Sequence, residues 1–360
     1  MRIIFIAGTL GQGGAEKQLF LLCKSLIENN WDVSVLCLTS GEFWERKLNE
    51  NGIPVIWAGK SSNRWKRLVE IIRLTYQYNP DIIYSFHFYT SFYAAVAGRL
   101  NGVFSIGSIR NDGFSEKRAN GLMSFLHFRL PNAIIANSQH GMLNAKAAFK
   151  SKNQKISILN NAIDLKKYQF KLKEISPNSG ITICFIGRLV DQKRPIKCLE
   201  IIKTINDRGI LKKGLIIGDG PLKKMLQEYI SNNKLEHKIS IIGKVNDIRP
   251  YLYKSDFLIS CSSAEGTPNV ILEAMACGTS ILAQDYQGIT NLLIDGEEIR
   301  GTVFSSRTHA VESVMKLLKS PNLTRQYSEN ARNFLEKYFS TNILYLNFQT
   351  TLKEIGFALK

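Results

Sequence analysis

The chain has 360 residues, more than one hydrophobic core usually supports, so we expect two domains. Its composition, 44% hydrophobic and 21% charged, is that of a globular protein, and no apolar run approaches the ~20 residues that span a bilayer. These values exclude a membrane-spanning protein and predict a soluble one. The net charge of +17 leaves three kinds of partner open: nucleic acid, an anionic membrane surface and phosphorylated small molecules.

The first residues place one cation before a short apolar run, but glycines and Glu16 follow too soon for a secretory signal. We therefore interpret them as a first strand and expect a cytoplasmic protein. Short β-branched runs then alternate with helix-length amphipathic stretches, which is typical of a parallel sheet with crossover helices. The predicted strands of the first half are Ile3–Ala7, Val33–Leu38, Pro54–Ala58, Asp81–Phe86, Phe104–Ile109 and Ala133–Asn137.

A glycine-rich loop containing Gly13 and Gly14 follows the first predicted strand. Glycines let backbone N–H groups approach a phosphate, and the next helix offers its positive N-terminus. The loop lacks G-x-G-x-x-G spacing, so a tight turn without a ligand is an alternative. Glu16 lies in the first helical turn, where it can simply complement the helix dipole.

Two predicted helices carry cations beside apolar side chains, which suits a surface resting on anionic lipid. A merely solvated face is the alternative. The first helix has Lys60, Arg64, Lys66, Arg67 and Arg73 around Trp65, Leu68 and Ile71, and the second has Lys117, Arg118 and Arg129 beside Phe125 and Phe128.

Residues 166–180 are rich in lysine and contain Pro177 and Gly180, so we interpret them as an interdomain linker. The alternation of strands and helices then restarts. Its predicted strands are Ile181–Ile186, Gly214–Ile217, Ile239–Gly243, Phe257–Ser260 and Ser280–Ala283, followed by final helices at 322–338 and 341–355.

This pattern predicts an α/β protein with two tandem doubly wound, Rossmann-like domains facing a cleft. The first domain spans 1–165 and would carry the acceptor side, and the second spans 181–340 and would bind a nucleotide-sugar. The terminal helix, within 341–360, would brace the domains. Ligands of open sheets bind beyond the carboxyl ends of the strands, so we expect the active site in the cleft.

Two loops of the second half carry polar signals directly after strands. Arg188 and Lys193 can converge on one anion, the arginine through two hydrogen bonds and the lysine as a mobile charge. A solvated helix face is the alternative for Lys193. Gly218 permits close approach of a ligand, although a plain turn would suffice there.

The strongest signal is the segment from Glu265 to Glu273. A strand runs into a polar loop, and Pro268 starts a helix whose free N–H groups favour an anion. Glu273 lies about one and a half turns into that helix. Two carboxylates beside a diphosphate need hydroxyl groups to accept from, such as those of a ribose and a sugar.

This segment resembles the E-x7-E signature of the group 1 family of retaining glycosyltransferases, which have the two-domain GT-B fold. Gly13 and Gly14 resemble its glycine-rich motif, Arg188 and Lys193 match its G-R-x4-K motif, and residues 161–164 resemble its N-G-I-D turn. The resemblance covers nearly the whole chain. It is most specific at 181–290 and loosest at 40–130.

The resemblance implies a role for each matched residue. Arg188 and Lys193 would neutralise the donor diphosphate, Glu273 would bind the ribose and Glu265 the transferred sugar. The donor-binding set is Gly13, Gly14, Arg188, Lys193, Gly218, Pro268, Asn269, Val270 and Glu273.

The sequence departs from the family at two places. Arg110 stands where many members carry a histidine, and it can replace that histidine electrostatically but not in proton transfer. His87, after the fourth strand, is then the other candidate for contact with sugar or acceptor, and a structural histidine is an equal alternative. Asn291 stands where the family usually has a glutamate, which puts a sugar contact from that loop in doubt.

The chain contains no Asp-x-Asp pair for a nucleotide-bound metal ion, so we predict metal independence and no cofactor besides the nucleotide-sugar, with a UDP-sugar favoured. The expected acceptor is a glycan or lipid-linked oligosaccharide in surface polysaccharide synthesis. We expect the protein to bind peripherally to the inner face of the cytoplasmic membrane. No interleaved aromatic platform supports a nucleic-acid partner. A nucleotide-sugar epimerase and a catalytically silent relative remain as alternatives.

The six scattered cysteines are predicted to be buried and unpaired.

Overall fold

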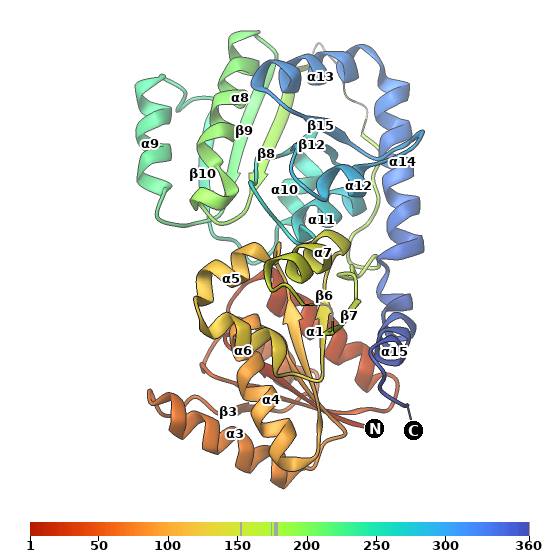
Figure 1. Ribbon diagram of the computed structural model, residues 1–360. Coiled ribbons are helices and arrows are strands. Elements are labelled where there is room, and N and C mark those ends of the chain that lie inside the picture. Colours follow the sequence, from red (N-terminus) through yellow and green to blue (C-terminus); the bar gives the residue numbers. More distant parts are fainter. Residues whose placement is uncertain (152, 174, 176–178, 360) are drawn as a thin grey trace. The chain divides into compact units, whose positions relative to one another are not determined.

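The structure is a computed structural model that describes residues 1–151, 153–173, 175 and 179–359. The chain divides into two compact units: Met1–Ala162 with Phe339–Lys360, called the N-terminal unit, and Ile163–Tyr338, called the C-terminal unit. Each unit has its own parallel sheet flanked by helices, which confirms the predicted α/β class with two doubly wound sheets (Figure 1). Within the predicted linker, residues 174 and 176–178 lie outside the described residues, Pro177 among them.

The N-terminal unit contains a seven-stranded sheet in the order β3-β2-β1-β4-β5-β6-β7, with every neighbouring pair parallel. Six strands agree with the predicted ones to within one residue at each end. The edge strand β7 has no predicted counterpart, because its short sequence mixes polar and apolar residues. The strands are β1 (Arg2–Ala7), β2 (Asp32–Cys37), β3 (Val55–Trp57), β4 (Ile82–Ser85), β5 (Phe104–Ile109), β6 (Ala133–Ala136) and β7 (Lys155–Ile158).

Strand β1 lies at the centre of this sheet and is buried on both faces. Ile3 and Phe5 point into the core shared with α1 (Gly14–Ile27) and α15 (Leu344–Glu354). Ile4 and Ile6 point into the opposite core, with α3 (Arg64–Tyr78) and α4 (Ser91–Asn101). The continuous apolar run of β1 is what a central parallel strand requires.

The remaining helical segments of this unit surround the same sheet. Two predictions were wrong. Lys60 lies before the basic helix α3, which begins at Arg64, and the basic residues between 117 and 129 lie on two helices, because Gly121 adopts a φ of +52° and ends the first. The segments are α2 (Phe43–Glu50), η1 (Phe88–Thr90), α5 (Phe114–Asn120), α6 (Met123–Arg129), α7 (Gln139–Ala148) and η4 (Thr341–Ile343).

The C-terminal unit contains a six-stranded parallel sheet in the order β10-β9-β8-β11-β12-β15. Strand β9 starts three residues earlier than predicted, since Lys212 and Lys213 interrupt its apolar pattern. Neither β15 nor the small hairpin β13-β14 was predicted, because all three strands are very short. The strands are β8 (Ile181–Ile186), β9 (Leu211–Ile217), β10 (Ile239–Gly243), β11 (Phe257–Ser260), β12 (Ser280–Gln284), β13 (Ile294–Asp295), β14 (Glu298–Ile299) and β15 (Thr302–Phe304).

Helices follow most strands of this sheet, and the predicted final pair is confirmed by α14 and α15. Within the predicted linker, Lys173 is tied to the C-terminal unit, because its Nζ contacts the carbonyl oxygens of Leu252 and Ser255 and donates to Oγ1 of Thr279 at 2.9 Å. The helical segments are η3 (Asp191–Lys193), α8 (Pro195–Asp207), α9 (Lys223–Asn232), α10 (Arg249–Lys254), α11 (Asn269–Cys277), α12 (Ile289–Leu293), α13 (Arg307–Lys319) and α14 (Pro321–Tyr338).

Each sheet reverses its strand order beside its first strand. The chain adds β2 and β3 on one side of β1 and returns to the other side with β4, and it repeats this plan with β8, β9, β10 and β11. Open α/β sheets bind ligands at such a switch point, beyond the carboxyl ends of the strands. The loops after β1 and β4 therefore form one candidate region, and the loops after β8 and β11 form another.

Candidate functional site

The loops after β8 and β11 are bonded to each other at the switch point of the C-terminal unit. The backbone N–H of Ser263 donates to the carbonyl of Gln192 at 2.9 Å, and the Gln192 side chain donates to the carbonyl of Ala264 at 2.7 Å. These bonds fix residues 187–193 relative to residues 261–268. Side chains from both loops are therefore held in a defined arrangement.

Lys193 and Glu265 form an ion pair across these two loops. Nζ of Lys193 contacts Oε1 of Glu265, and Oγ of Ser262 donates to the same oxygen at 2.8 Å. The two charged side chains are only 18% and 14% exposed. The structure thus brings the predicted diphosphate-binding cation directly against the predicted sugar-binding carboxylate.

Arg188 lies two residues beyond β8 and is exposed. Within the part of the chain that the structure describes, its guanidinium has no hydrogen-bond or ion-pair partner. An exposed guanidinium keeps its full fork of N–H donors for an anionic ligand. Its convergence with Lys193 on one anion stays a prediction.

Gly218 has a structural reason to be glycine. Its φ is +142°, and a Cβ at this position would overlap the carbonyl oxygen of Gly187 in the loop after β8. Only glycine lets the loops after β8 and β9 approach this closely. The role in ligand binding predicted for Gly218 remains a prediction beside this packing role.

Helix α11 begins at Asn269, with Pro268 in the preceding capping position, as the sequence predicts. Its positive N-terminal end therefore lies directly after the loop that carries Glu265. Pro268 is buried, whereas Asn269 and Val270 are partly buried. Donor contacts from the backbone groups of these three residues stay a prediction.

Glu273 is buried in the second turn of α11 and accepts a hydrogen bond from the hydroxyl of Tyr168 at 3.1 Å. Burial raises the pKa of Tyr168, and the charge of Glu273 raises it further. Tyr168 was not predicted, because it lies in the lysine-rich linker and belongs to no motif. One oxygen of the predicted ribose-binding carboxylate is therefore already held by the protein.

The loop after β1 in the N-terminal unit requires its glycines for space. Gly13 precedes α1, and Gly14 is the exposed first residue of that helix. A Cβ on Gly13 would overlap the carboxylate of Glu16, and one on Gly8 would overlap the Tyr89 hydroxyl. The glycines thus allow two polar side chains to lie against the backbone of the loop.

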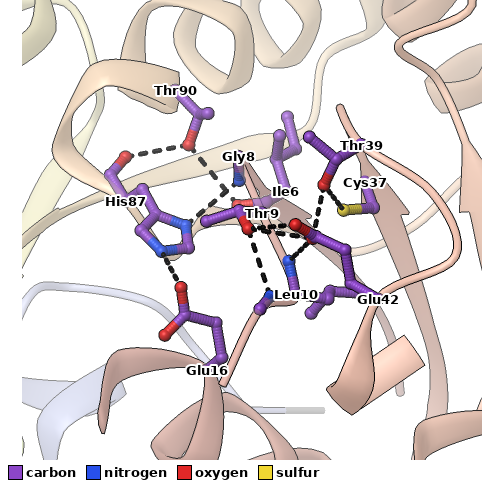
Figure 2. Close-up of polar contacts among 11 residues, drawn as sticks. Ile6, Gly8, Thr9, Leu10, Glu16, Cys37, Thr39, Glu42, His87 and Thr90 are labelled. Carbon is purple, nitrogen blue, oxygen red and sulfur yellow. Dashed lines mark hydrogen bonds and ion pairs between the residues drawn. The ribbon is translucent and has the colours of Figure 1, made fainter. Parts of the chain in front are cut away.

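His87 joins the loops after β1 and β4 (Figure 2). The backbone N–H of Gly8 donates to Nδ1 of His87 at 3.1 Å, and Nε2 lies 3.3 Å from Oε1 of Glu16. Since Nδ1 accepts, the ring proton is assigned to Nε2, which donates to the carboxylate. The imidazole is 12% exposed and held in one orientation.

A second carboxylate, Glu42, holds the same loop (Figure 2). It accepts hydrogen bonds from Oγ1 of Thr9 at 2.8 Å, from Oγ1 of Thr39 at 2.6 Å and from the backbone N–H of Leu10. Burial raises the pKa of Glu42, but these hydrogen bonds outweigh it and the net pKa is lowered. The sequence offers no signal for this role, because Glu42 lies far from the glycine motif.

Arg110 follows β5 and is partly buried. Its guanidinium carbon lies 3.6 Å from the centre of the Phe86 ring, and its terminal nitrogens lie 3.5 Å from Asn161 Oδ1 and from the Tyr84 hydroxyl. Burial lowers its pKa, partly offset by Tyr84. Among the described residues, no carboxylate pairs with the guanidinium, and its buried Nε has no partner.

Exposed apolar side chains accompany the two basic surfaces. On α3, Trp65 is 71% exposed, whereas Leu68 and Ile71 are buried in the core. On α6 and before it, Leu122 and Leu126 are exposed, whereas Phe128 is buried. A hollow of about 760 Å³ beside them is lined by Asp112, Phe114, Lys117, Arg118, Gly121, Leu122 and Phe125.

Three general features accompany these sites. All six cysteines are buried and unpaired, as predicted. Within the described ranges, no group of three or more His, Cys, Asp or Glu side chains could hold a metal ion. None of the helices in those ranges is both long and apolar enough to cross a membrane.

Comparison with known families accounts for almost the whole chain. Residues 12–167 match "Glycosyltransferase Family 4", and residues 167–334 match "Glycosyl transferases group 1". The chain belongs to the group 1 family of glycosyltransferases. The predicted family resemblance is therefore confirmed.

Curated relatives of this group 1 glycosyltransferase chain include enzymes of both archaea and bacteria. An uncharacterized glycosyltransferase of Methanocaldococcus jannaschii is 25% identical over 64% of this chain and 61% of its own length. The chain thus spans less than two thirds of that relative. A Campylobacter jejuni alpha-1,4-N-acetyl-D-galactosaminyltransferase, whose name includes a glycan on PP-undecaprenol, is 22% identical over 92% of this chain and 93% of its own.

Solved structures show the same fold. The structure of HepE from Anabaena in complex with UDP-glucose superposes with a TM-score of 0.84, at 18% identity, over 98% of this chain and 99% of that one. At this identity the similarity establishes the fold alone. The predicted GT-B fold is confirmed.

Proposed function

We propose that this protein is a retaining, metal-independent glycosyltransferase that moves a sugar from a nucleotide-sugar to a glycan or lipid-linked oligosaccharide. The observation that carries the proposal is the ion pair of Lys193 and Glu265 at the switch point of the C-terminal unit, beside the start of α11. Membership of the group 1 family supports the reaction class. Metal independence is supported by the lack of an Asp-x-Asp pair in the sequence.

The donor diphosphate is assigned to Arg188, Lys193 and the N-terminus of α11. When the nucleoside diphosphate leaves, negative charge builds on its oxygens. Fixed cations and helix N–H groups then stabilise the transition state more than the ground state. Because Lys193 contacts Glu265, binding of the diphosphate requires the lysine to share its N–H groups between carboxylate and phosphate.

The two glutamates are assigned to the neutral parts of the donor. Glu265 would accept hydrogen bonds from hydroxyls of the transferred sugar, with Lys193 as its ion-pair partner. Glu273, whose Oε1 accepts from the Tyr168 hydroxyl, would accept hydrogen bonds from the ribose. Gly13 and Gly14 would present backbone N–H groups to the diphosphate.

His87 and Arg110 are assigned to the reacting sugar and the acceptor. The hydrogen bond to Glu16 holds the His87 imidazole in one tautomer and one orientation. The ring is therefore pre-organised to orient a hydroxyl group of the sugar or acceptor. Arg110 supplies a cation without an acidic partner among the described residues. This charge would stabilise the leaving group or bind a phosphate of the acceptor.

Retention is proposed to proceed by attack of the acceptor hydroxyl on the same face from which the diphosphate leaves. The reason is that the sequence offers no well-placed nucleophile for a double displacement, and Glu265 is engaged with Lys193 and Ser262. Mass spectrometry of the enzyme with a slow fluorinated donor should show no covalent sugar. A glycosyl adduct on any side chain would contradict this mechanism.

The acceptor is proposed to be presented at the inner face of the cytoplasmic membrane, in surface polysaccharide synthesis. Two facts support this: the Campylobacter jejuni relative's name includes a PP-undecaprenol-linked glycan, and α3 and α6 expose apolar side chains beside cations. Vesicles containing anionic lipid should bind the protein more tightly than neutral vesicles. Equal binding, together with full activity on an acceptor without lipid, would contradict a membrane role.

The experiment that tests the function is a thermal-shift screen of UDP-, GDP- and ADP-sugars, followed by an assay of the stabilising donor with candidate acceptors. A ligand that binds only the native state raises its melting temperature. HepE was solved with UDP-glucose, which favours the UDP series. Stabilisation followed by release of an isomerised donor without transfer would indicate an epimerase instead, and binding without any turnover would indicate a silent relative.

A further inference from the structure

One tyrosine at the donor region of the C-terminal unit is buried with its polar end unsatisfied. Tyr286 lies in the loop after β12 and is 9% exposed. Among the residues that the structure describes, its hydroxyl has no hydrogen-bond partner. A buried hydroxyl without a partner loses its hydration and gains nothing in return, so its presence calls for an explanation.

The backbone around Tyr286 is held firmly. The N–H of Asp285 donates to the carbonyl of Phe304 at 2.8 Å, and the carbonyl of Tyr286 accepts from the N–H of Ile289 at 3.1 Å. These bonds tie the loop to β15 on one side and to α12 on the other. The backbone that carries Tyr286 is therefore fixed relative to β15 and α12.

The loop that carries Tyr286 follows β12, and β12 pairs in parallel with β11, Ser260 opposite Ala283, so this loop leaves the same edge of the sheet as the loop that carries Glu265. Burial raises the pKa of Tyr286, and the negative charge of Glu265 raises it further, so the phenol stays protonated. No hydrogen bond joins the two groups, since the Tyr286 hydroxyl has no partner among the described residues, and Oε1 of Glu265 is bonded to Lys193 and Ser262. A protonated phenol and a carboxylate thus flank the same region without contacting each other.

We propose that Tyr286 is a specificity-determining residue that hydrogen bonds a hydroxyl group of the transferred sugar. This inference rests on the proposed function, in which Glu265 binds the same sugar. A phenol can both donate and accept, which matches a sugar hydroxyl. The diphosphate is a poorer partner, because its oxygens only accept hydrogen bonds, whereas a sugar hydroxyl can both donate and accept.

Tyr286 differs from Asn291, the other candidate for a sugar contact from this part of the chain. Asn291, at the position expected to carry a glutamate, is exposed on α12. Tyr286 is then the buried hydrogen-bonding side chain that the loop offers beside Glu265. A sugar that lacks this hydroxyl would leave the buried phenol without a hydrogen-bond partner. The site would therefore select against that sugar.

The test compares Tyr286→Phe with wild type and with Tyr327→Phe, a control that removes a partly buried phenol elsewhere in the same unit. For the donor found by the thermal-shift screen, Tyr286→Phe should lower kcat/KM about tenfold, the typical value of one well-placed hydrogen bond. Calorimetry should give the same Kd for UDP alone, or for the donor's own nucleoside diphosphate. The melting temperature should stay or rise, since the variant removes an unsatisfied hydroxyl.

Deoxy analogues of the donor identify the contact. Wild type should turn over one analogue about tenfold more slowly, whereas Tyr286→Phe should treat that analogue and the full donor alike. The inference would be overturned if Tyr286→Phe discriminated against the deoxy analogue as strongly as wild type does. It would also be overturned if Tyr286→Phe bound the nucleoside diphosphate about tenfold more weakly, matching its loss in kcat/KM. Failure of wild type to bind any nucleotide-sugar would instead overturn the proposed function, so the two failures are distinguishable.

Discussion

The two units share one topology but place different chemistry at their switch points. In the C-terminal unit, a lysine from the first loop meets a glutamate from the loop across the switch point. In the N-terminal unit, a histidine after β4 meets a glutamate at the start of α1. We propose that the same sheet plan supplies cations for the diphosphate in the C-terminal unit, and backbone N–H groups and contacts to the reacting sugar and the acceptor in the N-terminal unit.

The difference extends to the cations around each pair. The C-terminal loops add exposed Arg188 and the N-terminus of α11, both suited to a diphosphate. The N-terminal unit instead has the buried carboxylate of Glu16 and the partly buried carboxylate of Glu42 around its glycine loop, and one cation, Arg110, after β5. We infer that the diphosphate charge is neutralised chiefly by the C-terminal unit.

The largest expected effect comes from breaking the charged pair of the C-terminal unit. Lys193→Ala and Glu265→Gln should each lower kcat/KM by about 100-fold or more, because each removes a group aimed at charge that develops in the transition state. Steady-state rates measure this, with circular dichroism to show that the fold survives. Lys197→Ala, on an exposed position of α8, should behave as wild type. Wild-type rates in either site variant would refute the assignment.

A pH change should weaken the N-terminal unit selectively. Burial, with a smaller effect of Arg64, lowers the pKa of His127 from 6.5 to about 4. Below pH 6.5 the unfolded chain therefore binds a proton that the folded chain does not. About 3 kcal/mol of stability, present above pH 6.5, should be lost as the pH falls to 4.

Urea unfolding between pH 7 and 4 measures this loss. Because Phe92 donates its backbone N–H to Nδ1 of His127, the variant His127→Phe should be less stable at neutral pH. It should also lose clearly less stability on acidification than wild type does. An unchanged acid dependence in the variant would show that other groups control the acid stability.

Two substitutions of Arg110 distinguish an electrostatic role of this residue from a purely structural one. Arg110→Met should lower kcat/KM by about tenfold or more, since a charged hydrogen bond contributes about 1.5–3 kcal/mol. Arg110→Lys should recover part of this loss because it keeps the charge. Steady-state rates at varied acceptor concentration test both variants. Equal rates in the two variants would show that the charge itself is not required.

The smallest expected effect is that of chelation. Excess EDTA should leave the transfer rate unchanged, because the diphosphate charge is assigned to Arg188, Lys193 and α11 and not to a metal ion. Rates with and without chelator, and after adding back Mg²⁺ or Mn²⁺, measure this. Loss of activity that a metal ion restores would contradict the proposal.

The fold could be predicted from the sequence because the central strands are continuously apolar and the helices between them are amphipathic. The edge strands β7 and β15 could not, since edge positions tolerate mixed polarity and need few residues. The positions of Arg188, Lys193, Glu265 and Glu273 after β8 and β11 could also be predicted, because these residues follow strand ends at fixed spacings, whereas their binding of a donor stays a prediction. Local sequence is enough where one loop and one helix build the site.

The contacts that were not predicted join residues far apart in the chain. Tyr168 reaches Glu273 from a segment without a motif, and Glu42 holds a glycine loop 32 residues before it. Tyr286 gives no signal at all, because only burial without a partner distinguishes it from a core tyrosine. Such contacts depend on tertiary packing, which periodicity and spacing do not contain.

The central claim is that the donor diphosphate is held by the C-terminal unit. Calorimetric titration of wild type, Lys193→Ala and Arg110→Met with UDP, or with the nucleoside diphosphate of the donor identified by the screen, tests it most directly. We predict that Kd rises about tenfold or more in Lys193→Ala and stays within twofold of wild type in Arg110→Met. Unchanged binding in Lys193→Ala, or a larger loss in Arg110→Met, would contradict the claim.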